Sequence, residues 1–275
     1  MDGLKSRFGL NAATIKIIAV VLMVLDHIHQ MFVLSGVPVW LTWLGRPVII
    51  MFLFASAESF YYMRSKKKYL IRLLIFSLAM AVINMVLQTS LPFPVAETGE
   101  TVALMNNAFG TFFIAGIYML FWDTITDGIK NRKAGKIIVA FVIFFTPVLA
   151  YIPIFTVSAN FDYFMEKLTF GQLSVLFTVC SAIPNVITVE GGPLIVMLGL
   201  VFYIFRKRRL VQIAALLAVS ILYFFSGNDA SNQWLMIFAA IPMLLYSGEK
   251  GRGMKWFFYI FYPVHIYLLY IIAWI

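Results

Sequence analysis

Two residues of the first apolar stretch, Lys16 and His27, have side chains and a spacing that suit a long ligand. Eleven residues make almost three turns of an α-helix, so the two side chains share one face about 16 Å apart. A cation there could hold phosphates, and a neutral imidazole farther along could act as a general base. An acyl-CoA, with its extended pantetheine arm, needs this combination. The alternative is that Lys16 snorkels to the bilayer surface and His27 is a hydrogen-bonded core histidine.

Asp26 and Arg46 form a second candidate pair. Asp26 precedes His27 and lies about 100° around the helix from it, so these neighbours are not automatically partners. We expect Asp26 to pair with Arg46 across the bundle, because such a pair costs far less in lipid than either charge alone. Arg46 could also polarise a thioester carbonyl or stabilise the oxyanion of a tetrahedral intermediate.

Further polar side chains interrupt the apolar stretches, where an ionisable group is a functional candidate by default. Lys68 and Arg72, spaced i and i+4, are suited to lipid headgroups or to the phosphates of CoA. Glu58 could pair with one of these two bases. In the last stretch, Pro263 should kink the helix and free a carbonyl near His265. The candidate substrate-binding residues are Glu58, Asn84, Glu190, Tyr262 and His265.

The amino-acid composition indicates the class of protein that holds these residues. Of 275 residues, 62% are hydrophobic and 12% are charged, against about 45–50% and about 25% in a soluble domain. So few charges cannot cover a soluble enzyme of this length, which excludes that class. The net charge of +9 comes from short basic runs between apolar stretches, a pattern typical of cytoplasmic loops and not of nucleic-acid binding. The one cysteine, Cys180, permits no intramolecular disulfide. The three histidines lack the spacing of metal ligands, so we predict no metal site.

A membrane-spanning helix needs about 20 apolar residues, and the sequence holds about ten apolar segments. We therefore predict an all-α integral membrane protein, a polytopic bundle forming a single domain over residues 1–275, embedded in the lipid bilayer of the cell membrane. The segments are Ala12–Leu34, Val39–Met63, Tyr69–Leu91, Ala108–Ile125, Ile137–Phe155, Leu173–Ile187, Pro193–Phe205, Leu210–Ser226, Trp234–Ser247 and Lys255–Ile275.

Basic runs orient the bundle with its N-terminus in the cytoplasm. Runs at 64–68, 130–136 and 206–209 mark cytoplasmic loops, whereas the stretch with Glu97 and Glu100 carries no base. Two full spans between Phe155 and Arg206 would place the third run outside. We therefore predict a re-entrant or broken helix there, because Pro184 and Asn185 interrupt one segment and the next is short. Its tip would hold Asn185, Glu190, Gly191 and Gly192, a backbone tolerated only when protein shields it or it lines a cavity.

Short motifs follow one another in order along nearly the whole chain. They are Lys16-Ile17-Ile18-Ala19, Met23-Val24-Leu25-Asp26-His27-Ile28, Leu44-Gly45-Arg46-Pro47 with Phe52 and Glu58, Tyr69-Leu70-Ile71-Arg72-Leu73, Glu190-Gly191-Gly192, Tyr246-Ser247-Gly248-Glu249-Lys250-Gly251 and Trp256-Phe257-Phe258-Tyr259-Ile260-Phe261-Tyr262-Pro263-Val264-His265. Together they resemble the TraX family, named for the protein implicated in N-terminal acetylation of conjugative pilin. Lys16, ten residues and then His27 also resemble the first-helix pattern of the transmembrane acyltransferases, including the acyltransferase-three group.

The resemblance implies transfer from cytoplasmic acetyl-CoA to an acceptor on the far side of the membrane. His27 becomes the base or a transient acyl carrier, with Asp26 and Arg46 as its electrostatic setting. Lys16, Lys68 and Arg72 become ligands of the CoA phosphates, and His265 a secondary candidate. The expected function is an acetyltransferase acting on an amine or hydroxyl of a peptide or glycan. The alternative is a proton-coupled small-molecule transporter, which would need matched broken helices in internal repeats, whereas the sequence shows one break.

Overall fold

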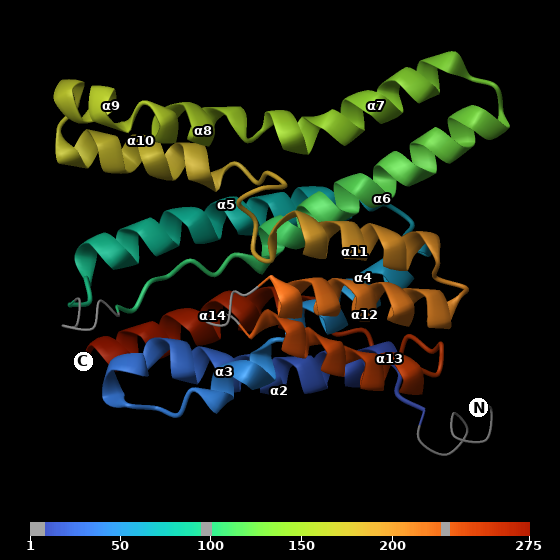
Figure 1. Ribbon diagram of the computed structural model, residues 1–275, viewed down its shortest axis with the longest axis horizontal. Coiled ribbons are helices and arrows are strands. Elements are labelled where there is room, and N and C mark those ends of the chain that lie inside the picture. The colour runs from blue at the N-terminus through green and yellow to red at the C-terminus, as the bar shows by residue number, and fades with distance from the viewer. Residues whose placement is uncertain (1–8, 95–100, 227–231) are drawn as a thin grey trace. The chain divides into compact units, whose positions relative to one another are not determined.

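The computed structural model describes residues 9–94, 101–226 and 232–275. These ranges form helices and loops (Figure 1), with one isolated bridge between Leu10 and Tyr246. The predicted all-α class is confirmed. Glu97 and Glu100, which entered the orientation argument, lie outside the described residues.

The apolar helices match the predicted segments. Six are long and apolar enough to cross a membrane: Ala12–Met31, Trp40–Tyr61, Lys66–Ser90, Ala108–Lys130, Ala134–Ala159 and Trp256–Trp274. The shorter apolar helices are Phe170–Ala182, Gly192–Ile204, Arg209–Phe225 and Gln233–Leu245. The protein is therefore a polytopic helical membrane bundle, as predicted.

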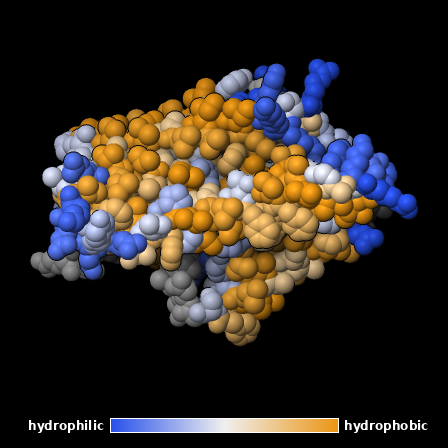
Figure 2. Space-filling model, turned by 90° about the horizontal axis from the view of Figure 1, so that it is seen from above, coloured by the Kyte–Doolittle hydropathy of each residue, from blue (hydrophilic) through white to orange (hydrophobic). Residues whose placement is uncertain are grey.

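Large apolar side chains cover much of the outer surface. On the face shown in Figure 2, hydrophobic residues dominate and hydrophilic residues gather toward the edges of the view. On α7 (Ala134–Leu149), for example, Ile138, Val142, Phe145 and Leu149 are all exposed along one side of the helix. A soluble domain would bury such a stripe, so this surface is suited to contact with lipid chains.

The helices divide into two compact units. The first comprises residues 1–62, 91–104 and 201–275, and the second residues 63–90 and 105–200. In the first unit, α2 packs against α3, α4 and α14 (Figure 1). Its elements are α2 (Ala12–Met31), η1 (Val33–Ser35), α3 (Trp40–Gly45), α4 (Val48–Tyr61), α12 (Arg209–Phe225), η3 (Gln233–Ala239), α13 (Ala240–Leu245) and α14 (Lys255–Trp274). The prediction of a single domain stays a prediction.

The second unit is built on α5 and α6, with α7 packed along α6. Ion pairs of Lys66 with Asp123 and of Lys136 with Asp127 join these helices near their ends. A core of Ile114, Tyr118, Val186 and Val196 fills its centre. Its helices are α5 (Lys66–Ser90), α6 (Ala108–Lys130), α7 (Ala134–Leu149), α8 (Ile152–Ala159), α9 (Phe161–Lys167), α10 (Phe170–Ala182) and the start of α11 (Gly192–Ile204). The short helix α9 was not among the predicted segments.

The predicted break lies between α10 and α11. The segment expected to run to Ile187 leaves its helix at Ala182, because Pro184 has no backbone N–H to donate. Asn185 is fully buried, and its Oδ1 accepts the backbone N–H groups of Ile187 at 3.1 Å and Thr188 at 2.9 Å. Gly191 and Gly192 follow with φ of 82° and 64°, values that L side chains rarely adopt. The side chain of Asn185 therefore replaces the hydrogen bonds that the broken helix cannot make.

Replacement of Asn185 by Ala should destabilise the protein by about 2 kcal/mol, because the N–H groups of Ile187 and Thr188 lose the acceptor that the buried Asn185 side chain supplies. We expect the midpoint of thermal unfolding in detergent to fall by about 5 °C or more. Asn160→Ala is the matched control, since Asn160 is exposed and its amide donates to the Thr156 carbonyl. An equal midpoint for the two variants at one scan rate would show that Asn185 does not support the break.

Candidate functional site

The candidate site centres on two buried histidines, His27 on α2 and His265 on α14. Nδ1 of His27 lies 2.7 Å from Nε2 of His265. The rings are nearly parallel, with centroids 4.9 Å apart and an interplanar angle of 21°. Only 4% of His27 and 7% of His265 is exposed. At this distance the two nitrogens share one hydrogen, so one ring donates and the other accepts.

The second nitrogen of His265 decides which ring donates. Its Nδ1 lies 2.7 Å from the carbonyl oxygen of Phe261, and a carbonyl only accepts, so this nitrogen carries hydrogen. With both rings neutral, Nε2 of His265 accepts the hydrogen on Nδ1 of His27. The basic nitrogen of His27 is then Nε2. The partners of His265 thus assign the tautomer of His27.

Aromatic rings of α14 surround the pair. The Phe261 ring stacks on His265 at 4.9 Å and 14°, and the buried Tyr262 ring lies 6.3 Å from His27 and 6.1 Å from His265. The structure therefore brings the predicted residues Tyr262 and His265 together with His27. The carbonyl that meets His265 belongs to Phe261, one helical turn before it on the same face.

Asp26 and Arg46 approach each other through a third residue, Thr42. Nη2 of Arg46 donates to the Thr42 hydroxyl at 2.6 Å, and the Thr42 side chain also hydrogen-bonds Asp26. Arg46 and Asp26 attract each other by charge, but the ion pairs of the described residues do not include Asp26, so the two groups interact through Thr42 and not by direct contact. The physical reason is that a hydroxyl can accept from a guanidinium while donating to a carboxylate. Nε of Arg46 is buried without a hydrogen-bond partner, so this guanidinium keeps a donor.

Lys16 of α2 faces α14, as His27 does. Its Nζ lies 5.6 Å from the centre of the Phe258 ring on α14, and the side chain is half-buried. Both Lys16 and His27 therefore point toward α14, as their spacing predicted.

Glu58 belongs to a separate cluster in the first unit. Its Oε1 lies 3.3 Å from Nη1 of Arg209, and Arg209 also donates to Gln212 at 2.7 Å. Gln212 is fully buried and donates to the Phe202 carbonyl at 2.6 Å. The expected pairing of Glu58 with Lys68 or Arg72 is therefore wrong. Its partner comes from the basic run at 206–209, which begins α12 beside the end of α4. The proposed substrate contact of Glu58 stays a prediction.

The remaining predicted residues lie in the second unit. Nδ2 of the buried Asn84 donates to the Asn106 carbonyl at 3.3 Å. Glu190 lies near the start of α6, where its Oε2 accepts the backbone N–H of Asn107 at 3.2 Å. At the start of α5, Lys68 is exposed and Arg72 is half-buried one turn later. The roles predicted for these four residues stay predictions.

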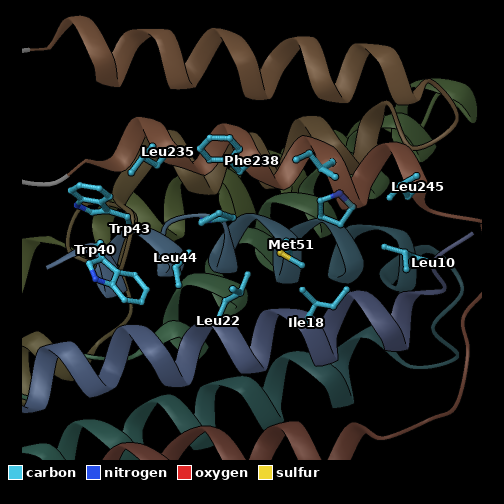
Figure 3. A pocket seen from close by; sticks show the side chains of 13 residues that line it. Leu10, Ile18, Leu22, Trp40, Trp43, Leu44, Met51, Leu235, Phe238 and Leu245 are labelled. Carbon is cyan, nitrogen blue, oxygen red and sulfur yellow. The ribbon is translucent and has the colours of Figure 1, made fainter. Parts of the chain in front are cut away.

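An apolar groove in the first unit was not predicted (Figure 3). It encloses about 530 Å³ between α2, the α3–α4 segment and the η3–α13 segment. Trp40 and Trp43 line one end, and Leu10 and Leu245 line the other. The i, i+4 spacing of Ile18 and Leu22 and the tryptophans of α3 were available signals, but such residues equally predict ordinary helix packing. The full lining is Leu10, Ile18, Leu22, Trp40, Trp43, Leu44, Pro47, Met51, Leu235, Phe238, Ile241, Pro242 and Leu245.

A family model matches most of the chain, including both histidines of the candidate site. The family model described as TraX protein matches residues 11–157 and 148–273. The chain belongs to the TraX family. The resemblance that the motifs indicated is confirmed, whereas the wider acyltransferase grouping stays a prediction. Comparisons with curated proteins and with solved structures found no match. In this TraX chain, the motif around His27 and the motif ending at His265 meet in one hydrogen-bonded pair.

A methyl group at Gly45 should disrupt the site, because an added Cβ would overlap the carboxylate and Cβ of Asp26. We expect Gly45→Ala to cost about 1–3 kcal/mol through overpacking between α2 and α3, measured as a lower midpoint of thermal unfolding in detergent. The control is Gly135→Ala on α7, where nothing lies within 4 Å of the added Cβ. Equal midpoints for the two variants would contradict the close approach of Asp26 to Gly45.

Proposed function

We propose that this TraX protein is a membrane-embedded acetyltransferase. It moves an acetyl group from cytoplasmic acetyl-CoA to an amine or hydroxyl of a peptide or glycan. The observation that carries the proposal is the Phe261–His265–His27 hydrogen-bond chain, because it holds a buried imidazole with Nε2 as its basic nitrogen.

The chemistry requires one base and a leaving thiol. Nε2 of His27 takes the proton from the acceptor N–H or O–H as the acceptor atom attacks the thioester carbonyl carbon. The tetrahedral intermediate then collapses, the C–S bond breaks, and the thiolate of CoA takes the proton back from His27. The products are the acetylated acceptor and CoA with a free thiol. While His27 holds the proton, its Nδ1–H remains hydrogen-bonded to His265.

An acyl-histidine route uses the same geometry. Nε2 of His27 attacks the thioester carbonyl carbon, the C–S bond breaks, and CoA leaves as a thiolate beside an acetyl-imidazolium that keeps its Nδ1–H. The acceptor atom then attacks the acetyl carbon, the C–N bond breaks, the neutral ring is released, and the acceptor proton passes to the CoA thiolate. Both routes pass through an oxyanion. Arg46 can supply a donor to it, since its Nε is buried without a partner and its Nη2 is positioned by Thr42.

The distribution of charge in the first unit supports the proposed orientation. The end of this unit near Lys16 also holds Arg209, whose guanidinium carbon lies 5.0 Å from the centre of the Tyr246 ring beside Leu10. The basic run at 206–209 therefore gathers at the end where α2 begins. By the positive-inside rule, this end faces the cytoplasm of the cell, where acetyl-CoA would meet Lys16 before its thioester reaches His27.

Replacement of His27 by Gln should abolish acetyl transfer. We expect acetyl-CoA-dependent thiol release by the protein in nanodiscs, supplied with a membrane extract as the source of acceptor, to fall by about 10² to 10⁴-fold. Binding of CoA should persist, since Lys16 is unchanged. The control is His29→Gln on the same helix. Retention of full thiol release by a folded His27→Gln protein would refute the proposed base.

His265 should act as a positioning residue for His27. His265→Gln places an amide oxygen within reach of Nδ1 of His27 and should keep thiol release within about tenfold of the wild type. His265→Leu removes the acceptor and should lose about 10²-fold, the lower bound for losing a general base. Rescue by Gln but not by Leu distinguishes positioning from packing, and equal rates for the two variants would contradict it.

A further inference from the structure

The loop between α13 and α14 lies along the start of α2 and is fixed there by backbone hydrogen bonds. The N–H of Leu10 donates to the Leu245 carbonyl at 2.9 Å, and the N–H of Ser247 donates back to Leu10 at the same distance. Farther along, the N–H of Ala12 donates to the Glu249 carbonyl at 2.8 Å. The loop therefore runs beside residues 10–12, where the chain enters α2, and Lys16 follows one turn later.

Gly251 holds the far side of this loop against α2. Its φ is +67°, and a Cβ there would overlap Oδ1 of Asn11 and come within 2.9 Å of the Ala13 Cβ. Asn11 cannot move away without cost, because its Oδ1 caps α2 by accepting the Thr14 N–H at 2.9 Å. Only glycine fits at 251, and Lys250 is confined between two residues that both contact α2.

This placement brings two like charges together. Lys250 lies between Glu249, which bonds to Ala12, and Gly251, which lies against Asn11, and Lys16 follows one helical turn after Ala12. Neither lysine forms an ion pair with any of the described residues. Lys250 is exposed, whereas Lys16 is half-buried beside Phe258. A polyvalent anion between the two would relieve the repulsion at a place where apolar neighbours strengthen the attraction.

We propose that Lys16 and Lys250 together bind a phosphate or diphosphate group, and that the Ser247–Gly251 loop holds Lys250 in place for it. This inference rests on the proposed function, in which the anion is the phosphate end of CoA. The pantetheine arm would then run along the α14-facing side of α2 for the distance of about 16 Å from Lys16 to His27.

The test measures binding and not transfer, so that its failure differs from failure of the proposed function. The full chain in detergent is titrated with CoA, adenosine 3′,5′-bisphosphate and pantetheine at low salt. Lys250→Ala should weaken binding of the first two by about tenfold, the effect of one charge-assisted hydrogen bond, and leave pantetheine unchanged. Lys207→Ala, which removes another exposed cation of the same unit that is not part of the Ser247–Gly251 loop, should change binding less than twofold.

Gly251→Ala keeps every charge and tests the geometry alone. We expect it to weaken bisphosphate binding as Lys250→Ala does, because the loop must leave Asn11. If Gly251→Ala and Lys250→Ala weakened bisphosphate binding no more than Lys207→Ala does, the proposed site would be overturned.

A lipid phosphate is the competing source of the anion. If Lys250→Ala lost bound phosphatidylglycerol while CoA binding stayed constant, the CoA assignment would be overturned. Loss of CoA binding in Lys250→Ala would support this site even if His27→Gln kept full transfer, a result that would refute His27 as the base.

Discussion

A buried imidazole in a membrane protein needs hydrogen-bond partners from the protein, because lipid chains offer none. His27 meets this requirement with His265, which in turn uses the carbonyl of its own helix at Phe261. The contact joins the first transmembrane helix to the last and fixes both their rotation and their register. Lys16 and Phe258 extend the same helix interface by further turns.

The polar groups of the first unit form separate sets, and each is supported by different neighbours. Asp26 of α2 and Thr42 of α3 lie beside Arg46, which follows the last residue of α3 and precedes Pro47 at the junction with α4. Glu58, Arg209 and Gln212 join the end of α4 to the start of α12. In the first set, Nε of Arg46 is a buried donor without a hydrogen-bond partner. In the second set, Arg209 binds both Glu58 and Gln212. This difference favours Arg46 as a group that meets substrate and Glu58 as one that holds helices together.

The sequence predicted the helices well because apolar length determines them. It also predicted that Lys16 and His27 share a face, since this depends on helix geometry alone, and it placed the break at Pro184 and Asn185 from local chemistry. It could not predict contacts between distant segments. His27 and His265 lie 238 residues apart, and no spacing rule joins them. The partner expected for Glu58 was wrong for the same reason, because many cations offered equal charge and only packing selected Arg209. The role of Thr42 between Asp26 and Arg46 was missed because a threonine in an apolar helix gives no signal of it.

The proposed chemistry depends on His265 fixing the tautomer of His27 so that Nε2 is the base. Solid-state ¹⁵N NMR of the histidine-labelled protein in lipid tests this directly, with His27 and His265 assigned by difference from single variants. If His265 fixes this tautomer, both rings carry hydrogen on Nδ1, and a coupling across the hydrogen bond joins Nδ1 of His27 to Nε2 of His265. A His27 ring protonated on Nε2, or two rings without that coupling, would contradict it.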